Sequence, residues 1–525
     1  MDTYQPMTNL LDSVRQLFPM EICPWDDYYM RMAQSDFFLD RHKLKASKTY
    51  FIRKAPFGGS FAHLGGLTAF LRTLKDFYFD ETVVSALLDQ GYAAEFVNYL
   101  HEQHCQIDVT TYAIPEGSIF FPNEPAVIIE GSLLDVRIAE GMLLSNVNYP
   151  SLSMTKWARV VQAAGQGSTM EFARRRAQDP LRTSLYAHLA GINISSNGEL
   201  RRGIDATIRG TMGHEWIQSF GDEFDSFDKW LEINPNRPVL LVDTVNTLKS
   251  GLPNAIKAFN KHWQRIKSVG GKPGIRNDSG DLAYITIEER LALDAVRVNG
   301  DDAGLTDVLI YQTNDLDEYL IEDIRQQIFT NASRSGLNAE SVIQRIVWAC
   351  GTQPGTCADQ PSLGGVAKLS TIEHWEKERA VIKLAYDHSG KVSIKTSIPG
   401  SNRSTWLRHK DTGEIFDCLI HDRNEDVTKC ATAQHPDDES SRIILQHMTD
   451  IEYIHRQKVA FKDCCIQPEF MPNVKDIIAL VKKEEGMLHW TMKRLKSPHT
   501  MKVSLSEQVF ELRKRLIFNK QLMDK

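Results

Sequence analysis

The stretch Ile208-Arg-Gly-Thr-Met-Gly-His-Glu-Trp-Ile-Gln-Ser-Phe220 contains a predicted strand end, a glycine-containing turn and a predicted helix start. The β-branched residues from Ala206 to Thr211 are typical of a short strand, and the residues from Glu215 onward are typical of the first turns of a helix. His214 is therefore expected in a tight turn between a strand and a helix. Barrel enzymes keep their reactive groups in turns of this kind.

Two explanations of His214 are open from this segment alone. Gly210 and Gly213 would let the backbone approach a ligand closely, and Glu215 could hold one imidazole nitrogen so that the other acts as a nucleophile. The alternative is a turn histidine that caps the helix. A single histidine near a glycine is common, so the choice depends on the rest of the chain.

Composition excludes several classes of function. The chain has 525 residues, ordinary globular fractions of apolar and charged residues, and a formal net charge of -7. The chain has no long block of lysine and arginine, so its composition gives no support for a nucleic acid or an anionic membrane as a partner. The N-terminal residues lack the pattern of a signal peptide, and no run approaches the roughly 18 apolar residues of a spanning helix. We expect a soluble cytoplasmic protein.

From about residue 165, strand-like runs alternate with helix-like runs, which predicts βα units and a parallel sheet. Because each run ends in polar residues or glycine, we expect a closed α/β barrel with functional groups at the carboxyl ends of its strands. The predicted strands are 169–173, 191–194, 207–210, 238–243, 274–278, 307–312, 345–350 and 365–369.

The remaining segments predict a second domain. Residues 1–135 are expected to form an N-terminal α+β domain, residues 136–395 the barrel, and residues 396–525 a segment that completes the N-terminal domain. At the first boundary, 134–163 has apolar residues at helical spacing, interrupted at Pro150. This pattern predicts a pair of packed helices.

Carboxylates, arginines and glycine turns follow the predicted strands. Carboxylates can hold a ribose diol or Mg²⁺, guanidinium groups suit phosphates or carboxylates, and glycine turns can cradle a phosphate. Together these groups suit a phosphorylated sugar with a metal. Taken singly, each has a simpler explanation: a surface salt bridge for Arg276 and Asp278, a helix cap for Asp243, core packing for Phe172 and Tyr28, and a plain turn for Gly364 and Gly365.

Six motifs in this order resemble nicotinate phosphoribosyltransferase. They are Glu171-Phe-Ala-Arg-Arg-Arg-Ala, Gly210-Thr-Met-Gly-His-Glu-Trp, Leu240-Leu-Val-Asp-Thr-Val-Asn-Thr-Leu-Lys-Ser-Gly, Gly274-Ile-Arg-Asn-Asp-Ser-Gly-Asp-Leu, Thr313-Asn-Asp-Leu-Asp-Glu and Gln360-Pro-Ser-Leu-Gly-Gly-Val. Residues 26–32 and the sequence Ala55-Pro-Phe-Gly-Gly match its N-terminal pattern, so the resemblance covers roughly residues 20 to 410.

The resemblance implies an irregular α/β barrel of the type II phosphoribosyltransferase kind, a second α+β domain, and a homodimer with active sites at its interface. It also implies a reaction. Nicotinate and phosphoribosyl pyrophosphate would give nicotinate mononucleotide and pyrophosphate, for NAD salvage, with coupled hydrolysis of ATP.

The resemblance further implies roles for individual residues. ATP would phosphorylate His214, beside Glu215, and Thr211 and Arg276 would contact the nicotinate carboxylate. Phe172 and Tyr28 of a neighbouring subunit would enclose the pyridine ring. Phosphoribosyl pyrophosphate would be bound by Arg175, Asp243, Asp278, Asp315, Gly351, Thr352, Gly364 and Gly365, with Asp278 and Asp315 holding Mg²⁺ directly or through water.

One departure from the family pattern keeps a second substrate open. Asn193 stands in a loop that commonly holds aspartate, and a residue near the ring could influence whether the acid or the amide is preferred. Nicotinamide is therefore the alternative substrate. A catalytically silent barrel that binds nucleotides is the alternative from another class.

Overall fold

The structure is a computed structural model that describes residues 9–298, 304–386, 388, 393, 396–438 and 440–523. Its contacts divide the chain into two compact units. Residues 156–361 form one unit, which we call the barrel unit, and residues 1–155 together with 362–525 form the other, which we call the sheet unit. None of the described helices is long and apolar enough to cross a membrane.

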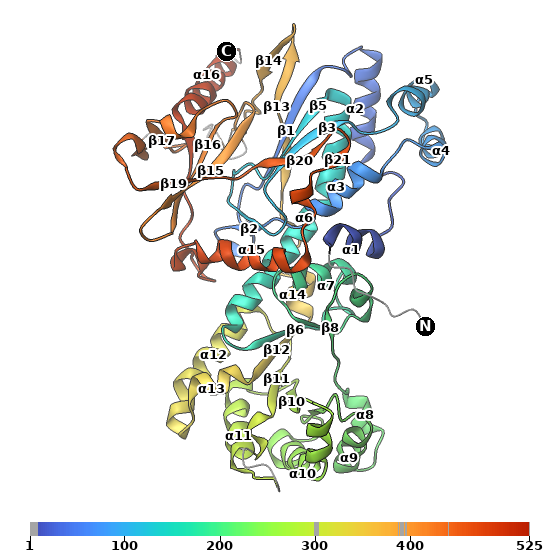
Figure 1. Cartoon of the computed structure of the whole chain (residues 1–525), viewed down its shortest axis with the longest axis vertical. Helices are drawn as coiled ribbons and strands as arrows, with labels where there is room; N and C mark the ends of the chain where they lie inside the picture. Colours follow the sequence, from blue (N-terminus) through green and yellow to red (C-terminus); the bar gives the residue numbers. More distant parts are fainter. Residues whose placement is uncertain are drawn as a thin grey trace. The chain divides into compact units, whose positions relative to one another are not determined.

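The barrel unit is organised around one parallel sheet of seven strands in the order β8-β7-β6-β12-β11-β10-β9. Figure 1 labels β6, β8, β10, β11 and β12 of this sheet. Every pair of neighbouring strands in this sheet runs parallel. The strands are β6 (Ser168–Glu171), β7 (Ile194–Ser195), β8 (Thr207–Ile208), β9 (Val239–Leu241), β10 (Gly274–Asn277), β11 (Leu309–Gln312) and β12 (Ile346–Cys350). All seven overlap predicted strands.

Helices separate these strands in the sequence, as βα units require. They are α7 (Pro180–Leu189), α8 (His214–Gln218), α9 (Glu223–Ile233), α10 (Leu252–Ser268), α11 (Leu282–Ala295), α12 (Glu318–Ala332), α13 (Ala339–Gln344) and α14 (Thr352–Thr356).

Successive side chains of a strand point to opposite faces of the sheet, and this decides which of them reach the site. Ile275 and Ile310 belong to a buried cluster that includes residues of α9 and α10, so they face the helices. Tyr311 and Val347 belong to a separate buried cluster, on the other face of the sheet. Arg276 is in register with Tyr311 and therefore lies on this inner face.

The parallel sheet agrees with the irregular barrel of the type II phosphoribosyltransferase kind, but two details of the prediction were wrong. Among the described strands, β8 and β9 are the sheet edges and do not pair, so the barrel is open. The predicted eighth strand is β13 (Val366–His374), which pairs antiparallel with β1 (Lys45–Phe51) in the sheet unit. A short buried apolar run looks the same in either kind of sheet.

The sheet unit contains two larger sheets. The first has the order β14-β13-β1-β5-β3-β20-β21 and is antiparallel throughout. The second has the order β18-β17-β22-β16-β15-β19, in which only β16 and β22 run parallel among the described pairs.

The remaining strands of the first sheet are β3 (Val109–Ala113), β5 (Val127–Ser132), β14 (Lys377–Ala380), β20 (Lys458–Lys462) and β21 (Cys465–Ile466). Those of the second are β15 (Asn402–His409), β16 (Ile415–Asp422), β17 (Thr432–Gln434), β18 (Arg442–Ile444), β19 (Ile451–His455) and β22 (Val503–Ser506), and a small third sheet pairs β2 (Ala62–His63) with β4 (Ile119–Phe120). The helices are α1 (Leu10–Leu17), α2 (Asp27–Phe38), α3 (Leu67–Asp76), α4 (Glu81–Asp89), α5 (Ala94–Tyr99), α15 (Val474–Gly486) and α16 (Glu507–Met523).

The predicted pair of helices at 134–163 is instead one long helix, α6 (Leu133–Ala164), with Pro150 inside it. Proline removes one hydrogen bond from a helix. The backbone of Gly66 packs against the carbonyl oxygen of Asn146, four residues before Pro150. A Cβ atom on Gly66 would lie only 2.0 Å from that oxygen. This close approach shows that the helix surface at the proline is covered, which agrees with a helix that continues through it.

The unit boundaries differ from the sequence-based domain boundaries. The chain divides after Thr155, within α6, and again after Pro361, before β13 joins the first sheet. Lys395, the predicted end of the barrel domain, lies outside the described residues. The boundaries at 135 and 395 stay a prediction, as does the completion of the N-terminal domain by 396–525.

Candidate active site

His214 is the first residue of α8 and follows a short loop after β8. The expected order of strand, turn and helix is therefore present. Its side chain is 41% exposed, so the imidazole is accessible to a ligand. Nδ1 lies 3.0 Å from Thr244 Oγ1, and Nε2 lies 3.8 Å from Asp278 Oδ2 and 4.0 Å from Asp243 Oδ1. One imidazole nitrogen thus meets a hydroxyl group and the other faces two carboxylates.

The partner expected for the imidazole was Glu215, but the structure places Thr244 at Nδ1 instead. Successive helix residues point about 100° apart around the axis, so the side chains of His214 and Glu215 diverge. Glu215 is exposed. Thr244 directly follows Asp243, so the loop after β9 supplies both a hydroxyl and a carboxylate to the histidine.

Asp243 has a side chain only 2% exposed, so it acts mainly on its neighbours. Its Oδ2 accepts hydrogen bonds from the backbone N–H of Asp278 (2.9 Å) and from the hydroxyl of Ser279 (2.7 Å). Its Oδ1 is buried without a hydrogen-bond partner in the described part of the chain and faces His214. This carboxylate therefore connects the loop after β10 to the histidine.

Arg276, on β10, holds several segments together. It donates from Nη1 to Thr211 Oγ1 (2.9 Å) and from Nη2 to Asp278 Oδ2 (3.1 Å), and its Cζ lies 5.6 Å from the centre of the Phe172 ring. Its Nε also lies 3.4 Å from Thr313 Oγ1. The guanidinium group is therefore fixed between a hydroxyl, a carboxylate and an aromatic ring.

Asp278 is kept ionised by its neighbours. Burial raises the pKa of this carboxyl, but the hydrogen bond from Thr313 and the positive charge of Arg276 outweigh that effect and hold the pKa below its usual value. A carboxylate is a good partner for a sugar hydroxyl, a metal ion or a developing positive charge.

These residues border a pocket of about 200 Å³ at the carboxyl ends of the parallel strands. Its lining consists of Phe172, Arg175, Arg176, Arg276, Asp278, Thr313, Asn314, Asp315, Ala349, Gly351 and Thr352. Three arginines and two aspartates around one small cavity suit a ligand that carries phosphates and hydroxyl groups.

Two further features shape the lining. Asn314 and Asp315 both have positive φ angles, 85° and 50°, a conformation that asparagine and aspartate tolerate better than most residues and that occurs often at functional sites. On β6, buried Glu171 accepts hydrogen bonds from Ala173 N and from the hydroxyls of Ser184 and Ser195. This carboxylate anchors the loop that carries Phe172 and the arginines.

The structure brings most of the predicted site residues together within the barrel unit. Phe172, Arg175, Arg276, Asp278, Asp315, Gly351 and Thr352 line the pocket, and Thr211, His214 and Asp243 contact it through Arg276 or Asp278. Tyr28, Gly364 and Gly365 belong to the sheet unit. The sequence prediction did not select Arg176, Thr244, Ser279, Thr313 or Asn314, although all except Arg176 lie within three residues of a strand's carboxyl end or beside a chosen aspartate.

The three residues of the sheet unit have distinct surroundings. Tyr28 is 52% exposed near the start of α2, and its ring centre lies 4.0 Å from that of Tyr29. Gly364 has a φ of +71°. A Cβ atom on Gly365 would lie 2.3 Å from the Tyr50 hydroxyl and from Asn148 Oδ1, so close packing explains this glycine.

A residue that influences the choice between nicotinate and nicotinamide should lie near the pocket at the carboxyl ends of the strands, and Asn193 does not. It is exposed and directly precedes β7, at the amino end of that strand. The residue near the loop arginines is Asn197, which accepts a hydrogen bond from Arg174. Asn193 therefore gives no support to nicotinamide as the substrate.

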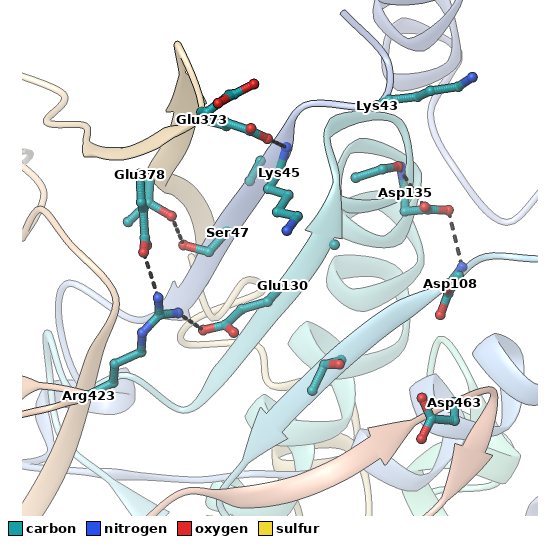
Figure 2. Close-up of a pocket in the computed structure, with 16 residues that line it drawn as sticks. Lys43, Lys45, Ser47, Asp108, Glu130, Asp135, Glu373, Glu378, Arg423 and Asp463 are labelled. Carbon is teal, nitrogen blue, oxygen red and sulfur yellow. Dashed lines mark hydrogen bonds and ion pairs between the residues drawn. The ribbon is translucent and has the colours of Figure 1, made fainter.

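A larger pocket, of about 700 Å³, lies in the sheet unit. Figure 2 shows that several of its carboxylates already have partners: Arg423 reaches Glu130 and Glu378, and Glu373 accepts from the backbone of Lys45. Acidic residues outnumber basic ones in its lining. Such a lining is a poor match for phosphates, so the smaller pocket in the barrel unit is the candidate active site.

The open parallel barrel, with arginines and aspartates at its strand ends, is the fold of the type II phosphoribosyltransferases. Two solved structures share the fold. The human nicotinic acid phosphoribosyltransferase aligns with a TM-score of 0.73 and 24% identity, covering 94% of this chain and 99% of that one. The nicotinate-nucleotide pyrophosphorylase from Pyrococcus furiosus aligns with a TM-score of 0.61 and 18% identity, covering 88% and 95%.

Sequence comparison identifies the family. Residues 25–148 match the model of the nicotinate phosphoribosyltransferase (NAPRTase) N-terminal domain, and residues 407–513 match that of its C-terminal domain. The nicotinate phosphoribosyltransferase of Bacillus subtilis (strain 168) is 30% identical over 492 residues, which is 92% of each chain. The chain belongs to the nicotinate phosphoribosyltransferase family.

Proposed function

We propose that this chain transfers the phosphoribosyl group of phosphoribosyl pyrophosphate to nicotinate, giving nicotinate mononucleotide and pyrophosphate for NAD salvage. The observation that carries the proposal is the fixed guanidinium of Arg276 beside the Phe172 ring. Nicotinate is a flat ring with a carboxylate, and an aromatic surface next to a guanidinium matches both features. Relatives named nicotinate phosphoribosyltransferase support the same substrate.

Thr211 and Arg276 would hold the carboxylate of nicotinate. The hydroxyl of Thr211 and Nη1 of Arg276 already contact each other, so both can turn donors toward one anion with little rearrangement. Phe172 would cover one face of the ring. Tyr28 of a second copy would cover the other, which makes the active enzyme a homodimer with sites at its interface, and the exposure of Tyr28 supports this role.

The other substrate would occupy the arginine-lined pocket. Arg175 and the Gly351-Thr352 turn, at the start of α14, would bind phosphate, since N–H groups at a helix start favour anions. Asp278 and Asp315 would face the ribose, where carboxylates stabilise the positive charge that develops as the anomeric C–O bond breaks.

Asp278 and Asp315 would also hold Mg²⁺, directly or through water. The described residues contain no group of three or more metal-binding side chains, but Mg²⁺ characteristically combines one or two carboxylates with waters and substrate phosphates. The two aspartates therefore fit this ion. When bound, Mg²⁺ would neutralise charge on the departing pyrophosphate.

His214 would be phosphorylated by ATP. The two carboxylates near Nε2 favour a proton on that nitrogen, so the lone pair is on Nδ1 and accepts a hydrogen bond from Thr244. The Thr244 hydroxyl would turn away as this lone pair acts as the nucleophile. Nδ1 would attack the γ-phosphorus, the bond to the bridging oxygen would break, and ADP would leave. Water would later cleave the N–P bond and release phosphate. The phosphohistidine would place nearly two negative charges beside the pocket and thereby strengthen binding of a Mg²⁺–pyrophosphate group.

Product analysis tests the proposal. Purified protein is incubated with Mg²⁺, phosphoribosyl pyrophosphate and nicotinate, and nicotinate mononucleotide is measured by chromatography, with ADP measured in parallel when ATP is added. We expect the mononucleotide, with ADP formed in step with it. A protein that binds phosphoribosyl pyrophosphate but forms no mononucleotide would instead be a nucleotide-binding barrel without activity.

A further inference from the structure

A buried polar cluster lies on the helix-facing side of the parallel sheet. Asn277, at the end of β10, is in register with Gln312, at the end of β11, and Thr286 and Glu289 on α11 meet them. All four residues are fully buried. Asn277 Nδ2 donates to Glu289 Oε2 (2.9 Å), and Gln312 Nε2 donates to Thr286 Oγ1 (2.5 Å). The site described above makes no use of Glu289.

This cluster lacks hydrogen-bond donors. Asn277 Oδ1, Glu289 Oε1 and Gln312 Oε1 are all buried acceptors without a partner in the described part of the chain. A buried carboxylate without sufficient donors is costly, whereas a neutral carboxylic acid carries no charge and adds one O–H donor. The composition of the cluster therefore favours a protonated Glu289.

The charged groups around Glu289 do not compensate a negative charge there. Arg290 is its neighbour, but the guanidinium of Arg290 donates to Asp294 and to the carbonyl oxygens of Val308 and Leu305. Burial raises the pKa of Glu289 to about 8; Asn277 and Arg290 oppose the increase, and the negative charge of Asp243 adds to it. These effects together favour the neutral acid at pH 7.

The cluster is connected to the candidate active site through Asn277. This residue stands between Arg276 and Asp278, and its carbonyl oxygen accepts from Thr313 N (3.0 Å) and Thr313 Oγ1 (2.7 Å). The same Thr313 hydroxyl reaches Asp278. A displacement of Asn277 would therefore move the two side chains assigned to nicotinate and ribose.

We propose that Glu289, as a neutral buried acid, is a positioning residue that holds Asn277 from the helix side and thereby fixes Arg276 and Asp278. Ionisation of Glu289 places an uncompensated charge behind the site and loosens this segment. The catalytic part of the inference rests on the proposed function, while the protonation of Glu289 does not.

Thermal unfolding tests the protonation without substrate. A carboxyl whose pKa is raised by folding binds its proton more tightly in the folded state, so its contribution to stability falls as pH rises from the unfolded pKa, near 4.3, to the folded pKa near 8, and then levels off. Glu289→Gln cannot ionise. The melting temperature of Glu289→Gln minus that of the parent should rise between pH 5 and 8 and stay constant above pH 8. A difference that does not vary with pH would refute a protonated Glu289.

Steady-state kinetics test the positioning role. In the parent, kcat/KM for nicotinate should fall at least fivefold between pH 7 and pH 9.5, whereas Glu289→Gln should lose less than twofold over the same range. The matched control is Glu288→Gln, which makes the same chemical substitution one residue earlier on α11, outside the buried cluster. It should keep the parent's alkaline decrease. An equal decrease in Glu289→Gln and the parent would overturn the positioning role.

A double-mutant cycle tests whether Glu289 acts through Asn277. Glu289→Leu leaves the Asn277 amide unpartnered and should raise KM for nicotinate about tenfold, while Glu289→Leu combined with Asn277→Leu pairs two apolar side chains and should recover part of that loss. Strictly additive effects would contradict the link. If the parent forms no mononucleotide at any pH, the proposed function fails, and the unfolding measurement still decides the protonation of Glu289.

Discussion

Arg276 joins parts of the barrel unit that are far apart in the sequence, since it contacts Thr211 after β8, Asp278 in its own loop and the Phe172 ring after β6. A lysine could keep the positive charge but could not make these contacts together, because its ammonium group is a single point of donation. The geometry of the guanidinium group is therefore as important for the site as its charge.

Replacing Arg276 by lysine should lower kcat/KM for nicotinate by on the order of 100-fold, mainly through KM, since two hydrogen bonds of a charged group are lost. Initial rates of mononucleotide formation at varied nicotinate measure the effect. Arg334→Lys is the control, because Arg334 lies exposed in the short turn after α12 and is not part of the pocket lining, so its change should leave kcat/KM unaltered. An Arg276→Lys enzyme with parental KM would exclude Arg276 from the nicotinate site.

The side chain that sets the orientation of His214 is Thr244. Thr244→Val should reduce ATP hydrolysis about fivefold to tenfold, the effect of about one hydrogen bond, and should reduce it more than Glu215→Gln does. His214→Ala should abolish ATP hydrolysis and leave slow transfer to nicotinate. ADP formation measures all three variants. A larger loss in Glu215→Gln than in Thr244→Val would restore the role that the sequence suggested for Glu215.

For individual residues, the sequence predicted which side chains gather at the pocket better than it predicted which of them contact one another. The chemistry of a strand end pointed to Arg276, Asp278 and Asp315 as candidates, because charged side chains after apolar strands are conspicuous, and the three line one pocket. It could not identify Thr244 as the partner of His214, since the two are brought together by the packing of separate βα units.

At the scale of elements, the ends of β10 and β11 act as a pair. Thr313, directly after β11, donates to the backbone carbonyl of Asn277 and lies within hydrogen-bond distance of Asp278. The parallel register of the two strands places these groups side by side. One hydroxyl therefore helps both to align two strand ends and to keep a carboxylate ionised.

Thr313→Val should make the enzyme more sensitive to acid. The folded pKa of Asp278 is held below its usual value, so the ionised form is present above that pKa and is lost as pH falls through it. Without the Thr313 hydrogen bond the pKa of Asp278 rises, and the acidic limb of kcat/KM should move to higher pH. Rates between pH 3 and 7, a range that includes the parent's acidic limb, measure the shift. An unchanged acidic limb would mean that Asp278 is not the group that titrates in catalysis.

The alternation of strands and helices predicted all seven strands of the parallel sheet, because βα units produce that period directly. It failed for residues 365–369, of which 366–369 form part of β13 in the other unit. It also divided α6 in two at Pro150, because packing of Gly65 and Gly66 against the proline turn is a tertiary contact without a local pattern.

At the scale of the whole molecule, the sheet unit depends on a buried ionic network. Arg456 donates to Glu484 (2.7 Å), lies 3.5 Å from Glu124 and packs 3.4 Å above the Trp406 ring. All of these side chains are buried. Removing the arginine would leave two buried carboxylates without their cation.

Arg456→Met should lower the free energy of unfolding by about 3–5 kcal/mol. Arg408→Met, on β15 of the same unit, breaks a partly exposed pair with Glu452 and should cost about 1 kcal/mol or less. Urea unfolding followed by tryptophan fluorescence compares the two, with the transition of the sheet unit assigned through Trp406. Equal losses in both variants would show that the buried network contributes no more than a surface pair.

The overall organisation was predicted only in outline. A catalytic barrel and a second domain of mixed structure follow from the change of pattern along the chain. The point at which the chain leaves one unit for the other depends on the single helix α6 and on the pairing of β13 with β1, which are settled by contacts distant in sequence.

The most direct test of the central claim is release of pyrophosphate by the purified protein with phosphoribosyl pyrophosphate and Mg²⁺, comparing nicotinate with nicotinamide, each with and without ATP. The fixed guanidinium of Arg276 predicts release with nicotinate and little with nicotinamide. Phosphorylation of His214 predicts that ATP increases the release with nicotinate. Release with nicotinamide alone would contradict the assignment of Arg276 to a carboxylate, and no release with either base would contradict the proposed reaction itself.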